Sequence, residues 1–558
     1  MSPFYLWVDA ICINQLDHRE KSIQVVAMKK TYQDALQVIV WLGDRAESRK
    51  ATRRAARFLE EFLPPLPDGG TLPVDPEEFR DVLRDSRVMD IMYIIGQNVL
   101  RRPWWWRMWV IQEVAVARSI VILCDGYRFS WDHLVLLSQW LSYLRADVMN
   151  ATEQDMAEGN HYLPNIRFKH GYRYNLVFAA DGGNEMPILD LLQNASSCQA
   201  TDNRDMIYSI LGLATDMTST TARTDGQVPD ATKNENSVVI DYSRREQEVY
   251  MDFAKVHIRT HEKNPLDVIT FSRYDPQRMT GLPSWVPDWS NLRRSSCSSL
   301  INPAVASPEK EAINPFYRYC ASAGLLPSFS IPADNTLCMS AIRFDHIAQV
   351  GVPYLESGPP DWKFRDTIRQ WQVLALGEES SIRESDSYQG GESTLLSVFD
   401  RTLSADTHVL GGRATPGRGY VFWERSLLGF SLSDPILANV MGPTSEVVQQ
   451  WATQQLSDAK RAVQLRIHRR RFFISSRGFF GLAPQNAEVG DEVFILPGCS
   501  VPVVLRRDGE IWTFIGETFV AGIMDGEAVQ AIDENRSDGD KEGKGSLLQG
   551  EEMDIVIR

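Results

Sequence analysis

The stretch Phe4–Gln15, FYLWVDAICINQ, places five apolar residues directly before a short polar loop. An uninterrupted apolar run of this length predicts a buried strand. A capping-box start and apolar residues at helical spacing predict a helix over 17–35, and Val38–Leu42 predicts a second strand. The order of strand, loop, helix and strand is typical of a βαβ unit, so we expect a parallel sheet.

Three polar residues of the first loop are candidate ligand-binding residues. Asp9, Asn14 and Gln15 follow the predicted strand, and ligands of parallel sheets gather at the carboxyl ends of strands. The alternative is that Asp9 and Asn14 only bond nearby backbone groups, as Asx residues in loops usually do.

The position of the first apolar run is unusual, because it starts almost at Met1. A strand can open an ordinary domain, and the alternative is that upstream sequence is missing. The apolar run by itself is compatible with both interpretations.

A second decisive stretch is Arg101–Arg118, RRPWWWRMWVIQEVAVAR. Pro103 suits a helix start, and the segment is long enough for about four turns. At 100° per residue one face of this helix carries Trp106, Trp109, Val110, Glu113 and Ala117. A carboxylate on an apolar face must be paired or hydrogen-bonded, and its burial raises its pKa. Glu113 is therefore a candidate functional group, or one half of a structural pair with Arg101, Arg102 or Arg107.

The tryptophans of this stretch allow two interpretations. A row of aromatic side chains can stack on single-stranded nucleic acid. Helical patterning and the balanced charge of residues 1–150 favour packing in a core instead. Beyond it, Ser119–Cys124 predicts a buried strand, and Asp125-Gly126 predicts a tight hairpin turn.

Composition narrows the class of protein. The 558 residues are 43% hydrophobic and carry a formal net charge of −15, which argues against disorder and against a protein that coats nucleic acid. The seven cysteines are scattered without metal-ligand spacing, so we expect free thiols in a reducing compartment. Among the histidines only His257 and His261 have such spacing, and because two neutral ligands alone are a weak signal, we expect no metal. No apolar run is long enough for a membrane span. We expect a cytoplasmic protein.

The remainder of the chain predicts several further regions. Short helices are expected over 202–212 and 242–260, and short strands separated by Gly, Pro or Asp-Gly turns follow Lys460, as in a small barrel. A basic cluster over 466–471 is interpreted as a solvated face, with nucleic-acid binding as the alternative. The predicted boundaries are an α/β domain over 1–118, a helical region over 119–290, a linker over 291–315, a mixed α/β region over 316–459 with an acidic loop at 376–394, a β-rich module over 460–530, and a flexible acidic tail over 531–558.

Three ordered blocks carry a resemblance to a known family. The blocks are LWVDAICINQ at 6–15, the helically spaced apolar residues that lead to VIVWLG at 38–43, and RMWVIQEV at 107–114. Together they resemble the heterokaryon incompatibility (HET) domain of filamentous fungi. The blocks NRDMIYSILGL at 203–213 and PDWS at 287–290, with two Gly-Asp/Glu-rich blocks after 490, resemble the regions that accompany this domain. The resemblance implies non-self recognition and regulated cell death through protein partners or a homo-oligomer of the HET domain.

One departure from the family pattern concerns the N-terminus. The family opens with a strand and loop of the type Leu-Ser-Tyr-x-Trp-Gly, which this sequence lacks. The resemblance therefore implies that the domain lacks its first strand and that its sheet has an unpaired edge.

The HET domain is in turn similar to the Toll/interleukin-1 receptor (TIR) domain, a flavodoxin-like parallel sheet that cleaves NAD in some members. There a catalytic glutamate follows a tryptophan on a helix, as Glu113 follows Trp109 here. The resemblance implies a candidate catalytic role for Glu113, with Trp109 and Gln112 as candidate ligand-binding residues beside Asp9, Asn14 and Gln15. NAD would be a substrate, and no cofactor is expected.

Overall fold

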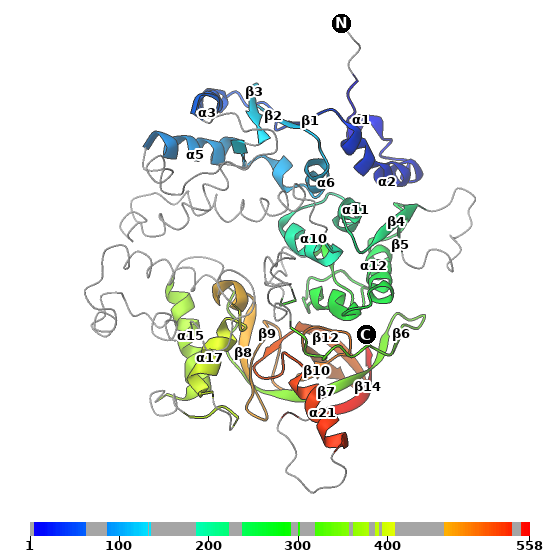
Figure 1. The fold of residues 1–558 in the computed structure, drawn as a ribbon, viewed down its shortest axis with the longest axis vertical. Helices are drawn as coiled ribbons and strands as arrows, with labels where there is room; N and C mark the ends of the chain where they lie inside the picture. The colour runs from blue at the N-terminus through cyan, green and yellow to red at the C-terminus, as the bar shows by residue number, and fades with distance from the viewer. Residues whose placement is uncertain are drawn as a thin grey trace. The chain divides into compact units, whose positions relative to one another are not determined.

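The computed structural model describes residues 5–62, 86–131, 133–134, 186–221, 237–291, 300–301, 319–355, 361–378, 386–389, 393–407, 463–537, 548 and 550–558. These residues form two compact units, Met1–Val249 and Tyr250–Arg558. Each unit is described by itself below, and both are drawn in Figure 1.

The N-terminal apolar run does not form the expected strand. Residues 5–8 have no regular structure, and the side chain of Tyr5 is 88% exposed. Helix α1 (Asp9–Cys12) follows at once, and helix α2 (His18–Asp34) begins after Asp17, whose carboxylate caps the backbone N–H groups of Arg19 and Glu20. The predicted first strand of the βαβ unit is therefore wrong: residues 5–8 pair with none of the described strands, although one edge of β1 is unpaired among them.

The sheet of unit 1 contains strands β1 (Val38–Trp41), β2 (Ile120–Cys124) and β3 (Tyr127–Ser130) in that order. β1 and β2 are parallel, whereas β2 and β3 form the predicted antiparallel hairpin. Helices α3 (Arg49–Phe62) and α5 (Ser86–Asn98) share one apolar core cluster with this sheet. The α/β character of the N-terminal region is confirmed, and a flavodoxin-like parallel sheet stays a prediction.

The helix expected over 103–118 is interrupted. A 3₁₀ turn, η1 (Pro103–Trp106), and helix α6 (Val110–Ala115) lie on either side of Arg107, whose backbone is extended. The reason is tertiary: the N–H of Gln199 donates to the carbonyl of Trp106 at 2.7 Å, and the N–H of Met108 donates to the carbonyl of Gln199 at 2.8 Å. These bonds replace helical ones, so local propensity is overridden.

The remainder of unit 1 is partly helical. Its elements are α10 (Ile188–Asn194), η2 (Ala195–Ser197), α11 (Asp205–Leu211), the parallel pair β4 (Thr218–Thr221) and β5 (Ser237–Ile240), and the start of α12 (Glu246–Thr260). The two helices predicted in this region are confirmed as α11 and α12, although residues 119–290 also hold four strands.

Unit 2 is built on one large sheet. Its strands are β6 (Phe329–Ser330), β7 (Leu337–Val350), β8 (Arg470–Ser475), β9 (Phe480–Pro484), β10 (Glu492–Ile495), β11 (Val503–Asp508), β12 (Ile511–Glu517), β13 (Phe519–Val520) and β14 (Glu551–Ile557). β10, β11, β12, β14 and β7 follow one another as neighbours, and a β10–β7 pairing closes them into a ring. The β-rich module after Lys460 is thus confirmed, but it also needs β7 from the preceding region.

The flexible acidic tail predicted over 531–558 is wrong where the structure describes it. Helix α21 (Glu527–Ser537) covers its start, and β14 lies between β12 and β7 in the middle of the sheet (Figure 1). β14 pairs with β7 over seven residues, from Glu551–Arg343 to Ile557–Leu337. The three acidic residues of EEMDIVI suggest a solvated tail, but Ile555 and Ile557 of the same segment are buried.

The helices and short turns of unit 2 complete its core. They are η3 (Pro265–Phe271), η4 (Trp289–Asn291), α15 (Asp361–Leu376) and α17 (Leu395–Leu403). The basic cluster before β8 is not a solvated face throughout, because Arg470 is fully buried with its Nη2 2.6 Å from Glu517 Oε1. The predicted linker 291–315 and the acidic loop 376–394 fall largely outside the described residues.

Candidate functional site

The candidate site is built around Glu113 in the first turn of α6. Its side chain is buried, with 7% of its surface exposed, and its Oε2 accepts a hydrogen bond from Trp104 Nε1 at 3.2 Å. Burial raises the pKa of Glu113 to about 7, although Arg107 and the Trp104 bond act in the opposite direction. The carboxyl group can therefore change its charge near neutral pH.

The residues whose charge acts on Glu113 come from distant parts of the chain. Asp9 of α1 lies beside Arg107, with Oδ2 3.6 Å from Nη2, and both groups influence the pKa of Glu113. Tyr32 of α2 is close enough that Glu113 and Asp9, together with burial, raise the pKa of its phenol. We call Asp9, Tyr32, Trp104, Arg107 and Glu113 the Glu113 cluster.

The expected arginine pairing is partly corrected. Arg102 does not serve Glu113, because it is buried with its Nη2 2.7 Å from Asp125 Oδ1. Arg107 influences Glu113 through charge and makes its ion pair with Asp9. The carboxyl group of Glu113 is thus buried and accepts a hydrogen bond from the Trp104 indole, and its pKa is high because burial outweighs the opposing effects of that bond and of Arg107.

The candidate ligand-binding residues separate into two groups. Asn14 and Gln15 are exposed, and the Asn14 side chain accepts from the N–H of Leu16 at 3.2 Å, as an Asx turn does. Asp9 lies on α1, not at the end of a strand, and its Oδ1 accepts from the N–H of Ala10 at 2.8 Å. The local-backbone interpretation therefore accounts for Asn14, whereas Asp9 joins the Glu113 cluster.

The other two candidates precede Glu113: Trp109 is the N-cap residue of α6, and Gln112 lies within the helix. Gln112 is buried, and among the described residues its Oε1 has no hydrogen-bond partner. Its Nε2 lies against α11, 2.8 Å from the place that a Cβ on Gly212 would occupy. Trp109 Nε1 donates to Asp205 Oδ2 at 3.0 Å. Both side chains therefore connect α6 to the middle of unit 1.

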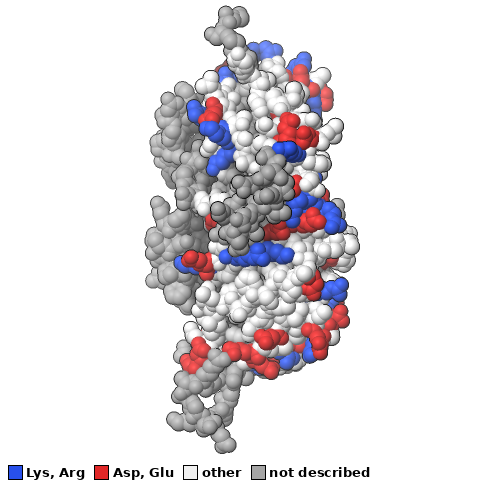
Figure 2. All heavy atoms as spheres, turned by 90° about the vertical axis from the view of Figure 1, so that its right-hand side faces the viewer, with Lys and Arg blue, Asp and Glu red and all other residues white. Residues whose placement is uncertain are grey.

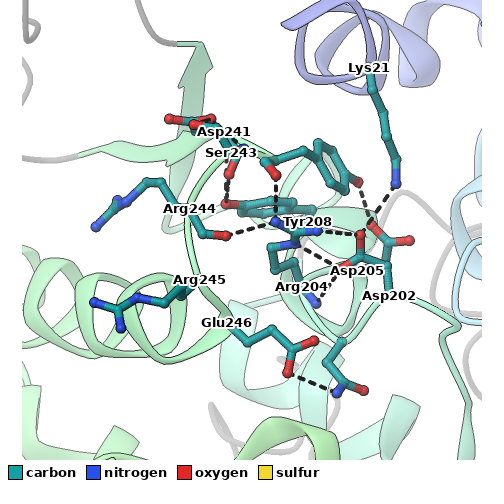
Figure 3. A network of polar contacts seen from close by, with 12 residues as sticks. Lys21, Asp202, Arg204, Asp205, Tyr208, Asp241, Ser243, Arg244, Arg245 and Glu246 are labelled. Carbon is teal, nitrogen blue, oxygen red and sulfur yellow. Dashed lines mark hydrogen bonds and ion pairs between the residues drawn. The ribbon is translucent and has the colours of Figure 1, made fainter. Parts of the chain in front are cut away.

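Asp205 is the centre of a second polar group. The sequence did not predict that Asp205 would bind Trp109. Its other oxygen, Oδ1, accepts from the hydroxyl of Tyr242. Burial raises the pKa of Asp205, although these two hydrogen bonds act against the shift. Lys21 of α2 lies over the Tyr242 ring with Nζ 3.8 Å from the centroid. Figure 3 shows Lys21 reaching toward Asp202 and Asp205.

Arg204 ties the same network to the loop after β5. Its guanidinium binds both carboxylate oxygens of Asp202 at 2.9 Å and donates to the carbonyls of Tyr242 at 2.5 Å and Arg244 at 2.7 Å (Figure 3). Burial disfavours the charged form of Asp202, but the Arg204 bonds outweigh it and lower the pKa of Asp202. The only sequence signal for this arrangement is the polar NRD triplet that opens α11.

The two groups share helix α6. Trp109 faces the Asp205 network and Glu113 faces its own cluster, and the N–H of Glu113 donates to the carbonyl of Trp109 at 3.1 Å. A change at Asp205 can therefore reach Glu113 through less than two turns of helix. No group of three or more His, Cys, Asp or Glu side chains suited to a metal ion occurs among the described residues.

Comparison with known proteins yields two family profiles and one relative. Residues 1–113 match the family described as heterokaryon incompatibility protein (HET), and residues 449–538 match the Het-6 β-barrel domain. The chain is 22% identical to "Heterokaryon incompatibility protein 6, OR allele" of Neurospora crassa, over 94% of this chain and 82% of the relative. No solved structure matches. The first match ends at Glu113, and the second leaves out β7 and β14 of the closed ring.

Proposed function

Since this chain is a HET-domain protein of filamentous fungi, we propose that it acts in the cytoplasm in non-self recognition and triggers regulated cell death. The trigger is self-association of the HET domain, and the C-terminal half regulates it. The observation that carries this proposal is the alignment with a heterokaryon incompatibility protein over nearly the whole chain, rather than over one domain alone.

The surface supports protein partners. On the face drawn in Figure 2, small groups of basic side chains alternate with acidic ones and with wide uncharged areas. A surface of mixed sign fits association with another protein better than phosphate binding, which needs a continuous basic patch. Among the described residues, no helix is long and apolar enough to cross a membrane.

A second candidate function is NAD glycohydrolase activity, and the buried Glu113 favours it. An ionised carboxylate next to the ribose would stabilise the oxocarbenium-like state as the bond to nicotinamide breaks, and water would then complete ADP-ribose. Because burial raises the pKa of Glu113 to about 7, the active ionised form increases with pH through neutrality. The aromatic rings of Trp104 and Tyr32 would flank the substrate.

Glu113→Ala and Glu113→Gln distinguish the two functions, with the exposed Glu60→Gln as a matched control on α3. Each variant is overexpressed in a filamentous fungus, and cell death and cellular NAD are followed together. Death that persists in both Glu113 variants at constant NAD refutes the enzyme. NAD loss that requires Glu113 refutes a pure scaffold. Survival of cells that express the wild-type chain with intact NAD refutes both.

A further inference from the structure

Strand β1 is an edge strand of unusual character. The N–H of Val38 donates to the carbonyl of Ser119 at 2.8 Å, and the N–H of Leu42 donates to that of Leu123 at 2.8 Å. In a parallel pair these alternate residues face the neighbouring strand, so the N–H and C=O groups of Ile39 and Trp41 point away from β2. Within the described part of the chain, β2 is the one strand that pairs with β1.

The side chains of the same two residues are also uncovered. Ile39 is 41% exposed and Trp41 is 70% exposed, whereas Val38 and Val40 on the other face are buried. Strands of a parallel sheet are apolar on both faces because both faces are normally covered. β1 has this composition, but one of its faces and one of its edges remain open.

Strand β1 itself carries none of the sequence features that usually protect an edge strand. Leu36–Gly43 contains no charged residue and no proline, and the pairing of β1 with β2 shows no bulge. Natural proteins guard exposed edges with lysines, prolines or bulges, because an unguarded edge pairs with another chain. The edge of β1 is therefore suited to strand addition.

We propose that β1 of one copy pairs with β1 of a second copy, antiparallel about a two-fold axis, so that the two sheets become one. This inference rests on the proposed self-association and names the surface that carries it. A two-fold axis perpendicular to the sheet keeps each face on its own side, and the register with Val40 opposite Val40 then sets Ile39 opposite Trp41. Aromatic and β-branched residues are favourable cross-strand pairs.

Charge decides the direction of pairing and favours a second copy as the occupant. Asp34 is the last residue of α2 and precedes β1, and Asp44 and Arg45 follow β1. Within one copy Asp34 lies near Lys30 and Arg118, and Asp44 pairs with Arg49 on the surface. Parallel pairing would set Asp34 beside Asp34 and Asp44 beside Asp44. Antiparallel pairing instead directs the end of β1 near Asp34 in one copy toward the end near Arg45 in the other, twice by symmetry, with the uncharged stretch between them.

The test is sedimentation velocity of the full chain up to about 100 µM, since small interfaces bind weakly. Ile39→Pro removes an N–H that points away from β2, and Trp41→Lys adds the charge that edges normally carry. The matched control is Leu326→Lys, because Leu326 is 73% exposed and lies in unit 2. We expect a wild-type dimer, an unchanged control, and at least about tenfold weaker association in both edge variants.

Cross-linking checks the register. Cysteines at positions 39 and 41 together, introduced as Ile39→Cys with Trp41→Cys, should join two copies, whereas either substitution alone should not, because directly opposite residues meet disulfide geometry. Dimers that persist in both edge variants overturn this surface and leave self-association intact. A wild-type chain that stays monomeric overturns both the inference and the proposed self-association. The edge of β1 would then be expected to pair with a strand of a different protein.

Discussion

Replacing Glu113 by Gln should stabilise unit 1 above neutral pH. Gln has the shape of Glu and keeps an oxygen that can accept the hydrogen bond from Trp104 Nε1. It cannot ionise, so it avoids the cost of burying a charge. Burial raises the pKa of Glu113 from 4.5 to about 7, which means that the folded state holds a proton that the unfolded state has lost between these values.

The sign and size of the effect follow from linkage. Between pH 4.5 and 7 the folded state binds more protons than the unfolded state, so its stability falls as the pH rises. Each pH unit between the two pKa values is worth about 1.4 kcal/mol, which gives a loss of about 3 kcal/mol at pH 8. Glu113→Gln should recover most of this loss at pH 8 and change little at pH 4.5.

The assay follows urea-induced exposure of Cys124, a fully buried thiol in the core cluster of unit 1. Thiol labelling resolved by mass spectrometry isolates this cysteine, and comparing variants at one pH cancels the chemistry of the label. The exposed Glu60→Gln should not alter the pH dependence. If the wild type and Glu113→Gln lose stability in parallel between pH 5 and 8, Glu113 is not the buried group described above.

Three further outcomes are expected. Asp125→Ala should destabilise unit 1 by about 3–5 kcal/mol in the Cys124 assay, because it leaves a buried guanidinium without its carboxylate. Asp44→Ala breaks a solvent-exposed ion pair and should destabilise unit 1 far less; equal effects of the two substitutions would contradict the burial of the Arg102–Asp125 pair. Tyr242→Phe should cost about 1–3 kcal/mol, because buried Asp205 loses one of its two donors; unchanged unfolding in urea would contradict the hydrogen bond. Deletion of residues 551–558 should remove the hydrogen-exchange protection of β7 amides, because β14 pairs with seven residues of that strand; retained protection would show that the ring closes without β14.

Hydrogen bonds connect the surroundings of Glu113 to the loop after β5. Trp109 contacts Asp205 through a hydrogen bond, and Asp205 in turn contacts the loop after β5 through Tyr242. Movement of that loop would reach α6 without passing through the sheet. Residues 203–213 lie outside both matched domains, yet through Asp205 they contact the residue that caps α6.

Features with local causes were predictable. The capped helix α2, the strand β1, the Asp125-Gly126 hairpin and helix α11 each depend on a cap, an apolar run or a turn residue within a few positions. The resemblance of the N-terminal blocks to the HET domain depends on sequence alone and is confirmed by the comparisons. The burial of Glu113 was also predicted, although the helical face used for that prediction is interrupted at Arg107.

Features that depend on distant neighbours were not predictable. Residues 5–8 have the composition of a strand but pair with no described strand. Arg107 interrupts a good helical pattern because Gln199 bonds the backbone on both sides of it. β14 looks like an acidic tail and lies in the middle of a sheet because β7 and β12 receive it.

The sequence by itself determined which segments could form helices, strands and turns, since these choices depend on local dihedral preferences and on the period of apolar residues. It also determined the family. The tertiary structure alone decided the partners: Arg102 for Asp125, Asp205 for Trp109, and an indole for Glu113. The physical reason is that the charge state of a buried group depends on desolvation and on whichever donors the fold brings near, and neither is encoded within a few residues of it.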